Sequence, residues 1–135
     1  MKETNVKEKG YKMYSNSAHN IYAQNNVGIE SSHKLIEMLY EGVLRFNAQA
    51  KKAIKDNNIE KRIYWLNRSI AIVTELLSAL DIKQGDVALY LDGLYRQEMV
   101  LLSSVSIDSD ISKLDEVSKV FKCLLEAWRE SADVA

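Results

Sequence analysis

The chain has 135 residues, a formal net charge of −1 and an apolar share of 47%. This length fits one domain with its own core, and a net charge near zero creates no field that would concentrate nucleic acid or anionic lipid at the surface. The sequence also lacks proline, which favours long helices without interruption. We therefore expect an all-α protein that binds no nucleic acid.

Cys123 is the single cysteine of the chain. It cannot form an internal disulfide, so the protein fits a reducing compartment. The N-terminal residues show no apolar run typical of a signal peptide, and no segment approaches the roughly 18 consecutive apolar residues of a membrane-spanning helix. These observations predict a cytoplasmic protein without membrane insertion.

Residues 1–26 are rich in lysine, asparagine, serine and tyrosine and show no sustained apolar periodicity. Such a composition is typical of a flexible segment. We expect a mobile N-terminal arm over residues 1–26, with room for one short extra helix between Tyr14 and Gln24, followed by a four-helix bundle over residues 27–132.

Apolar residues that recur at steps of three and four predict four long helices after the arm. The first helix has Ser31 as its expected N-cap. Its predicted apolar seam consists of Ile36, Leu39, Val43, Phe46, Ala50 and Ala53. The second seam consists of Ile59, Ile63, Leu66, Ile70, Val73, Leu77 and Leu80. The third consists of Val87, Leu91, Leu94, Leu101 and Val105, and the fourth of Leu114, Val117, Phe121, Leu124 and Trp128.

Three short polar breaks separate the predicted helices. They lie at residues 57–58, at residues 81–86, where Gly85 can adopt a positive φ, and at residues 108–110. Connections this short force neighbouring helices to run antiparallel. The predicted fold is an antiparallel up-down-up-down four-helix bundle.

The two middle helices carry more apolar residues than one buried face needs. At about 100° per residue, a second stripe lies roughly 100–160° away from each seam. It consists of Trp65, Ile72, Leu76 and Ala79 on the second helix, and of Leu89, Val100 and Ile107 on the third. The surplus fits helices buried on two sides, a stripe covered by the N-terminal arm, or a groove for a partner, and these alternatives stay open at this point.

Glu98 occupies a position where the third seam predicts an apolar residue. A charged group there needs a partner or water. We therefore expect Glu98 near an edge of the bundle, in an ion pair with a basic side chain.

The sequence contains no catalytic or metal-binding pattern. Glu30 and His33 have the i, i+3 spacing of bundle metal sites, but such sites need a second pair and further inward glutamates. The chain has only His19 and His33, in the arm and at a helix start, whereas a phosphotransfer histidine would lie exposed in mid-helix. Cys123 has no sequence partner for redox or zinc chemistry. We predict no enzyme activity, no metal site and no cofactor.

Residues 27–46 read VGIESSHKLIEMLYEGVLRF. This segment resembles the flagellin export chaperone family, FliS, which characteristically has a polar arm with tyrosine and a Lys-Leu-Ile-x-Met-Leu-Tyr-Asp/Glu-Gly motif. Further similar segments are DNNIEK at residues 56–61, TELL at 74–77, LDGLY at 91–95 and LLEAWR at 124–129. The resemblance runs from about Tyr14 to Arg129. It departs from the family at Ser32, where proline is usual, and at residues 84–86, where two glycines are common.

The resemblance implies a bundle that binds the disordered C-terminal region of flagellin in the cytoplasm, prevents premature polymerisation and delivers flagellin to the flagellar type III export apparatus. The implied partners are the C-terminal helical segment of flagellin, the export apparatus and a co-chaperone. The alternative is a general helical adaptor that binds another flagellar regulator or co-chaperone.

The second apolar stripes suggest where such a partner would bind. We expect partner contacts at Trp65, Ile72, Leu76, Leu89 and Val100, with Ile21, Tyr22 and Val27 of the arm over the same surface when no client is bound.

Overall fold

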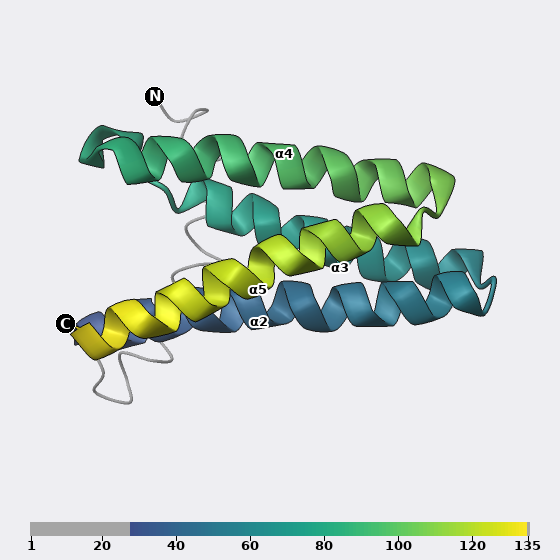
Figure 1. The fold of residues 1–135 in the computed structure, drawn as a ribbon, viewed down its shortest axis with the longest axis horizontal. Helices are drawn as coiled ribbons and strands as arrows, with labels where there is room; N and C mark the ends of the chain where they lie inside the picture. Colours follow the sequence, from purple (N-terminus) through teal and green to yellow (C-terminus); the bar gives the residue numbers. More distant parts are fainter. Residues whose placement is uncertain (1–27, 135) are drawn as a thin grey trace, which may run out of the picture.

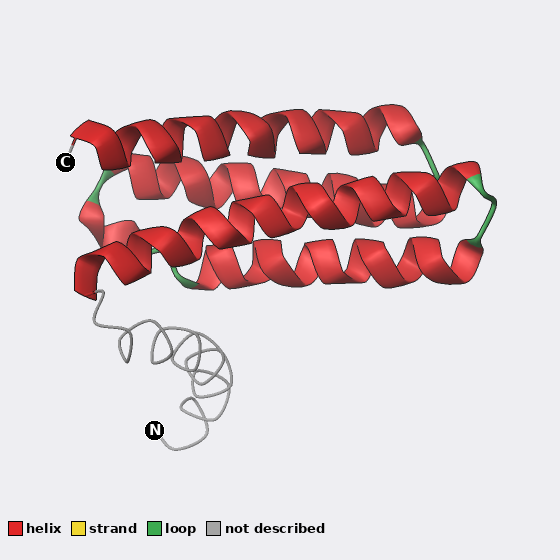
Figure 2. Ribbon diagram, turned by 90° about the horizontal axis from the view of Figure 1, so that it is seen from below, coloured by secondary structure: helices red, strands yellow, loops and turns green. Residues whose placement is uncertain are grey.

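The computed structural model describes residues 28–134, which form four α-helices and one short 3₁₀ helix. The elements are α2 (Gly28–Lys55), α3 (Ile59–Ser78), η1 (Ile82–Gln84), α4 (Asp86–Asp108) and α5 (Ile111–Val134). Figures 1 and 2 show the four α-helices side by side, with short loops at both ends. The predicted all-α four-helix bundle is confirmed for this part of the chain. None of the helices described combines the length and the apolarity needed to cross a membrane.

The helices are separated at the predicted breaks. Asn57 has a φ of 54°, and Asn58 caps α3 because its Oδ1 accepts a hydrogen bond from the backbone nitrogen of Lys61 at 3.0 Å. Gly85 has a φ of 122°, so the positive φ predicted there is confirmed. Ser109, with a φ of 58°, ends α4. Asn57 and Gly85 are residue types that tolerate a positive φ, whereas Ser109 is held there by the hydrogen bond from its backbone nitrogen to the Val105 carbonyl oxygen at 2.8 Å.

The start of α2 differs from the sequence-based expectation. The helix begins at Gly28, so Ser31 lies inside it and is not its N-cap. A proline at position 32 would disfavour helical geometry for residue 31, whereas Ser32 imposes no such restriction. The helix can therefore extend toward the N-terminus beyond the predicted cap.

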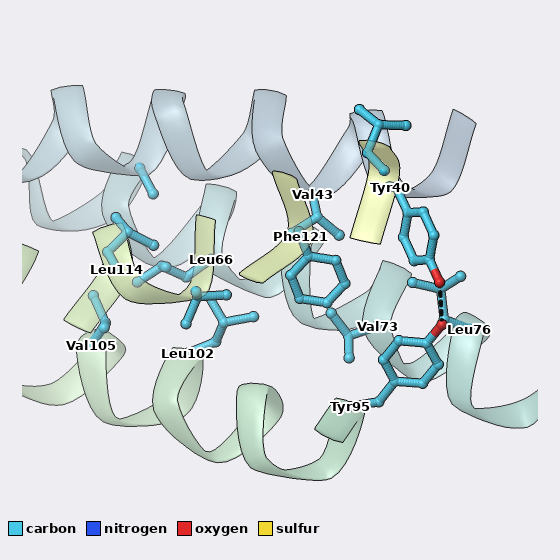
Figure 3. Close-up of a cluster of buried hydrophobic side chains, with 13 residues drawn as sticks. Tyr40, Val43, Leu66, Val73, Leu76, Tyr95, Leu102, Val105, Leu114 and Phe121 are labelled. Atoms are coloured by element: carbon cyan, nitrogen blue, oxygen red, sulfur yellow. Dashed lines mark hydrogen bonds between the residues drawn. The ribbon is translucent and has the colours of Figure 1, made fainter. Parts of the chain in front are cut away.

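The core runs along the bundle axis and takes residues from all four α-helices. Its members are Tyr40, Val43, Ala50, Leu66, Val73, Leu76, Tyr95, Leu102, Val105, Leu114, Val117, Phe121 and Leu125. Figure 3 shows Phe121 in the middle of this cluster, with Tyr40 and Tyr95 on one side and Leu66, Leu102 and Leu114 on the other. Burial of these side chains is the main force that holds the helices together.

The buried face of α3 is rotated relative to the predicted seam. Ile59 and Ile63, assigned to the seam, are 61% and 39% exposed. Leu76, which lies on the second stripe, is only 1% exposed and belongs to the core, so at this position the alternative of a helix buried on two sides holds and no exposed partner contact is found. The spacing of apolar residues does not reveal the buried face of α3, because one position on that face, Ser69, is polar. Its hydroxyl donates a hydrogen bond to Oδ1 of Asn47 at 2.7 Å.

The buried face of α4 also differs from its predicted seam. Val87 is 74% exposed, while Tyr95 and Leu102, which the seam omitted, are buried in the core. Tyr95 can be buried because its hydroxyl lies 2.6 Å from the hydroxyl of Tyr40, and the two share a hydrogen bond (Figure 3). Burial raises the pKa of both phenols, so both stay neutral.

A buried polar network connects three of the four α-helices. Asn47 of α2 accepts the hydrogen bond from Ser69 of α3, and its Nδ2 donates to the hydroxyl of Ser118 on α5 at 3.1 Å. These bonds satisfy polar groups that would otherwise be costly to bury. They also fix α2 relative to α3 and α5.

The remaining α-helix, α4, contributes a buried carboxyl instead. Glu98 is 1% exposed, and within residues 28–134 its Oε1 has no hydrogen-bond partner. The expected ion pair with a basic side chain is not found among the described residues, and the expected edge position is wrong because the face of α4 with Tyr95, Leu102 and Val105 points to the core. Burial raises the pKa of Glu98, and the charge of Glu116 on α5 raises it further.

Replacing this carboxyl should stabilise the protein. We expect Glu98→Leu to raise the free energy of unfolding by about 1–3 kcal/mol, because the substitution removes an unsatisfied buried group and keeps a similar volume. Urea denaturation followed by circular dichroism measures the change. Glu126→Leu, on the exposed side of α5, is the control and should change stability by less than about 0.5 kcal/mol. A loss of stability in Glu98→Leu would show that the carboxyl has a structural partner.

The same group predicts a pH dependence. Its pKa in the folded chain lies above the ordinary value of 4.5, so the folded state binds this proton more tightly than the unfolded state. The penalty for ionised Glu98 is therefore complete above the raised pKa and disappears as pH falls toward 4.5. We expect the stability advantage of Glu98→Gln over the wild-type chain to be largest at neutral or higher pH and to shrink on acidification. A constant difference between the two proteins from pH 8 to pH 4.5 would contradict this prediction.

Candidate partner-binding surface

One helix presents a continuous row of exposed residues along its outer side. Leu89, Gly93, Arg96, Val100, Ser103 and Ile107 follow one another on α4 at steps of four and three, and all are exposed. We call this row the α4 outer stripe. Its apolar members Leu89, Val100 and Ile107 are 60%, 70% and 86% exposed. The stripe extends over about 27 Å of helix, which is long enough to contact several turns of a partner helix.

The position of α4 explains why this row stays uncovered. The helix contacts α3 and α5, and it turns Tyr95, Glu98 and Leu102 toward the core. At about 100° per residue, the α4 outer stripe then lies on the opposite side. In Figure 1, α4 lies at one side of the bundle, and α5 runs from the end of α4 toward the start of α2. No other described segment covers the outer side of α4.

Exposed apolar residues continue onto the first turns of α4. Val87 and Tyr90 are 74% and 67% exposed, although the sequence assigned Val87 to the core and did not single out Tyr90. The reason is the path of α5, which has left α4 at this end of the bundle (Figure 1). A spacing pattern within one helix contains no information about where a neighbouring helix diverges. The exposed apolar surface is therefore wider at the N-terminal end of α4 than the sequence indicated.

The charged member of the stripe is neutralised within its own helix. The Arg96 side chain donates a hydrogen bond from Nε to Oδ2 of Asp92 at 3.0 Å. This pair has the i, i+4 spacing that places both groups on one side of a helix. The stripe therefore presents an apolar and nearly neutral surface, which suits contact with apolar side chains better than with phosphate or nucleic acid.

The structure divides the sequence-predicted contact residues into two groups. Leu89 and Val100 are exposed on the α4 outer stripe, so the alternative of a helix buried on two sides does not hold for these two residues. Trp65 is half-buried and stacks on Phe46 of α2, with the ring centroids 5.5 Å apart. These residues do not form one surface, because Trp65 faces α2 and the other two lie on α4.

The other predicted contacts on α3 are also engaged within the bundle. Ile72 is half-buried and packs on the core beside Gly42 of α2, and Leu76 is part of the core. A substitution at either position would disturb the fold as well as any partner. Ile21, Tyr22 and Val27 lie outside the described residues.

His33 connects the start of α2 to the end of α5 and is not a free first-turn residue. Its ring stacks on Trp128 at a centroid distance of 4.4 Å, and the indole Nε1 donates to the His33 carbonyl oxygen at 2.8 Å. Nearby, the Arg129 side chain donates to Oε2 of Glu37 at 2.8 Å. This hydrogen bond, together with Lys34, holds the pKa of Glu37 below its ordinary value. The residues around His33 thus have a structural role.

The remaining candidates for chemistry stay separate. Within residues 28–134, no group of three or more histidine, cysteine, aspartate or glutamate side chains could hold a metal ion. Cys123 is a free, exposed thiol.

Comparison with known proteins agrees with the sequence resemblance. A family model described as flagellar protein FliS matches residues 14–135. The flagellar secretion chaperone FliS of Campylobacter jejuni is 53% identical over 119 residues, which cover 87% of this chain and 93% of that protein. FliSB of Pseudomonas aeruginosa, also named a flagellar secretion chaperone, is 31% identical over 121 residues, or 86% of this chain and 96% of the relative. FliS of Escherichia coli K12 is 29% identical over 127 residues, with 88% and 92% coverage.

The two groups of apolar residues should differ sharply in their effect on stability. Leu89→Ala and Val100→Ala should each change the free energy of unfolding by less than about 0.5 kcal/mol, because both side chains are exposed. Leu76→Ala should cost about 2–5 kcal/mol, because it removes a core side chain. Urea titration of the three variants checks the contrast. A cost above 1 kcal/mol at Leu89 or Val100 would show that the stripe is covered in the free chain.

Proposed function

Because the chain belongs to the FliS family of flagellar proteins, we propose that it is a flagellar secretion chaperone that binds flagellin in the cytoplasm. It holds the C-terminal region of flagellin, prevents premature polymerisation and delivers the bound client to the flagellar type III export apparatus. The function is non-enzymatic. The main support for the position of the binding site is the α4 outer stripe, where Leu89, Val100 and Ile107 are exposed along one side of one helix.

The shape of this stripe favours a helical client. Its residues recur at steps of three and four, so an amphipathic helix laid along α4 can place its own apolar residues against each of them. A disordered flagellin C-terminus would gain helical structure as it buries these contacts. The client segment would then be unavailable for contacts with other flagellin molecules.

The energetics suit a chaperone that must release its client. Burial of a large apolar side chain contributes about 1.5–3 kcal/mol, while the ordering of a disordered segment consumes part of that gain. Three large apolar residues along the stripe therefore give a moderate net affinity. Such a complex forms readily and can be taken apart at the export apparatus.

The N-terminal arm remains part of the proposal. We expect Ile21, Tyr22 and Val27 to lie over the same apolar surface when no client is bound, in a loose contact that adds little to the stability of the bundle and that the client displaces. Deletion of residues 1–20 should leave the bundle folded.

The alternative is a helical adaptor for another flagellar regulator or co-chaperone. A pull-down from cell lysate distinguishes the two when it is repeated with the flagellin C-terminal segment as competitor. Loss of the captured protein on competition supports flagellin as the client. Capture that is unaffected by the competitor supports the adaptor.

Charge on the α4 outer stripe should weaken client binding strongly. We expect Leu89→Glu and Val100→Glu to weaken binding of a flagellin C-terminal peptide by at least about 30-fold, because each buries a carboxylate against the client helix. Isothermal titration calorimetry measures the affinity, and far-ultraviolet circular dichroism checks that the bundle is intact.

The matched control is Ala71→Glu, which adds the same charge to an exposed position on α3. It should bind like the wild-type chain. Wild-type affinity in both α4 variants would move the binding site away from this stripe. Failure of the wild-type chain to bind the peptide would argue against the proposed function itself.

A further inference from the structure

Two glycines lie in the interior of helices, and only one of them has a reason within the bundle. A Cβ added to Gly42 of α2 would lie 2.7 Å from Cδ1 of Ile72, so glycine makes room for that side chain. A Cβ added to Gly93 of α4 would meet no heavy atom within 4 Å in the described structure. Gly93 also has no positive φ; among the described glycines that conformation occurs at Gly85. Within residues 28–134, neither packing nor backbone geometry requires a glycine at position 93.

Glycine in the interior of a helix is unfavourable relative to alanine, because it adds conformational freedom to the unfolded chain. At Gly93 the bundle gains no internal contact in return. The residue lies in the α4 outer stripe, four residues after Leu89 and seven before Val100, and it is exposed. The missing side chain leaves the backbone of α4 open between two exposed apolar residues. A partner backbone could approach α4 more closely here than at any flanking position of the stripe.

We propose that Gly93 is the point where a bound client helix crosses α4 at close range, with a small client residue, glycine, alanine or serine, facing it. Helices approach most closely where both contribute small residues, and the apolar residues on either side then interlock. This inference rests on the proposed function, since its occupant is the flagellin helix. Gly93 would then select clients that have a small side chain at the crossing point, and it would fix the register of the client helix along Leu89 and Val100.

The surroundings of Gly93 match such a crossing. Leu89 and Val100 provide apolar contacts on both sides, and Tyr90 extends the surface beside them. The Arg96 guanidinium is held by Asp92, so no unpaired charge of the stripe adjoins the crossing point. The charge nearest the crossing point is therefore compensated within its own helix and needs no partner from the client.

A graded substitution tests the inference. Gly93→Ala should raise the Tm of the free chain by roughly 2–5 °C, because alanine favours the helix and its methyl group meets open space. The same variant should bind the flagellin C-terminal peptide about 5- to 10-fold more weakly, and Gly93→Leu at least about 50-fold more weakly. The matched control is Ala71→Leu, which adds bulk to an exposed position on α3. It should bind like the wild-type chain.

The outcomes separate this inference from the proposed function. Loss of affinity together with a higher Tm supports close approach at Gly93, because a folding defect would lower both. Wild-type affinity in Gly93→Leu, while Leu89→Glu and Val100→Glu lose binding, would overturn the close approach and leave the client surface in place. Sedimentation of the client-free proteins adds a further check. A wild-type dimer that Gly93→Leu converts to monomer would assign the contact to a second copy of the chain and overturn the client assignment.

Discussion

A helix in a four-helix bundle can turn only one side toward the common core, since its two neighbours occupy the flanks and its outer side faces solvent. This constraint has little consequence for α2 and α5, whose apolar residues lie mostly on the buried and flanking sides. It matters for α4. Tyr95, Leu102 and Val105 satisfy the core, so Leu89, Val100 and Ile107 remain outside. The outer row of α4 is therefore not a defect of the fold but a direct result of apolar residues on two sides of a helix that can bury one.

The sequence allowed the fold to be predicted because its signals are local. Apolar steps of three and four, Asn57–Asn58, Gly85 and the break near Ser109 determine the number of helices and the breaks between them, but not the start of α2 at Gly28. The assignment of faces was less accurate. Ser69 and Glu98 are polar residues on buried faces. A prediction from apolar spacing alone places such residues at the surface or at an edge of the bundle. The burial of Leu76 was not predicted either, because the buried side of α3 that it shares with Ser69 does not appear as a continuous apolar row in the sequence. The exposure of Leu89 and Val100 was predictable from their angle to the α4 seam, whereas that of Val87 depends on the path of α5.

The buried polar groups also distinguish α4 from the other helices. Hydrogen bonds through Asn47 join α2 to α3 and α5, and stacking of His33 on Trp128 joins the ends of α2 and α5. On α4, one buried hydroxyl contact between Tyr95 and Tyr40 is offset by Glu98, whose Oε1 is unsatisfied within the described residues. The helix that carries the outer stripe is therefore the one with an unsatisfied buried carboxyl oxygen among the described residues. Binding of a client to this helix would add stability by mass action.

The two mid-helix glycines show that a residue can lower the stability of its own helix for two different reasons, one within the fold and one in a complex. At Gly42 the absent side chain is used inside the bundle, because Cδ1 of Ile72 occupies the space. At Gly93 no described atom uses it, and the cost is borne by the free chain alone. A residue that weakens its own helix without an internal contact is understandable if the benefit arises in a complex, since selection acts on the bound state as well as on the folded monomer. Alanine at this position would make the free chaperone more stable, but its methyl group would stand between α4 and any helix that crosses it closely. Stability of the free bundle and affinity for a client would then change in opposite directions at a single residue, which no effect on folding alone can produce.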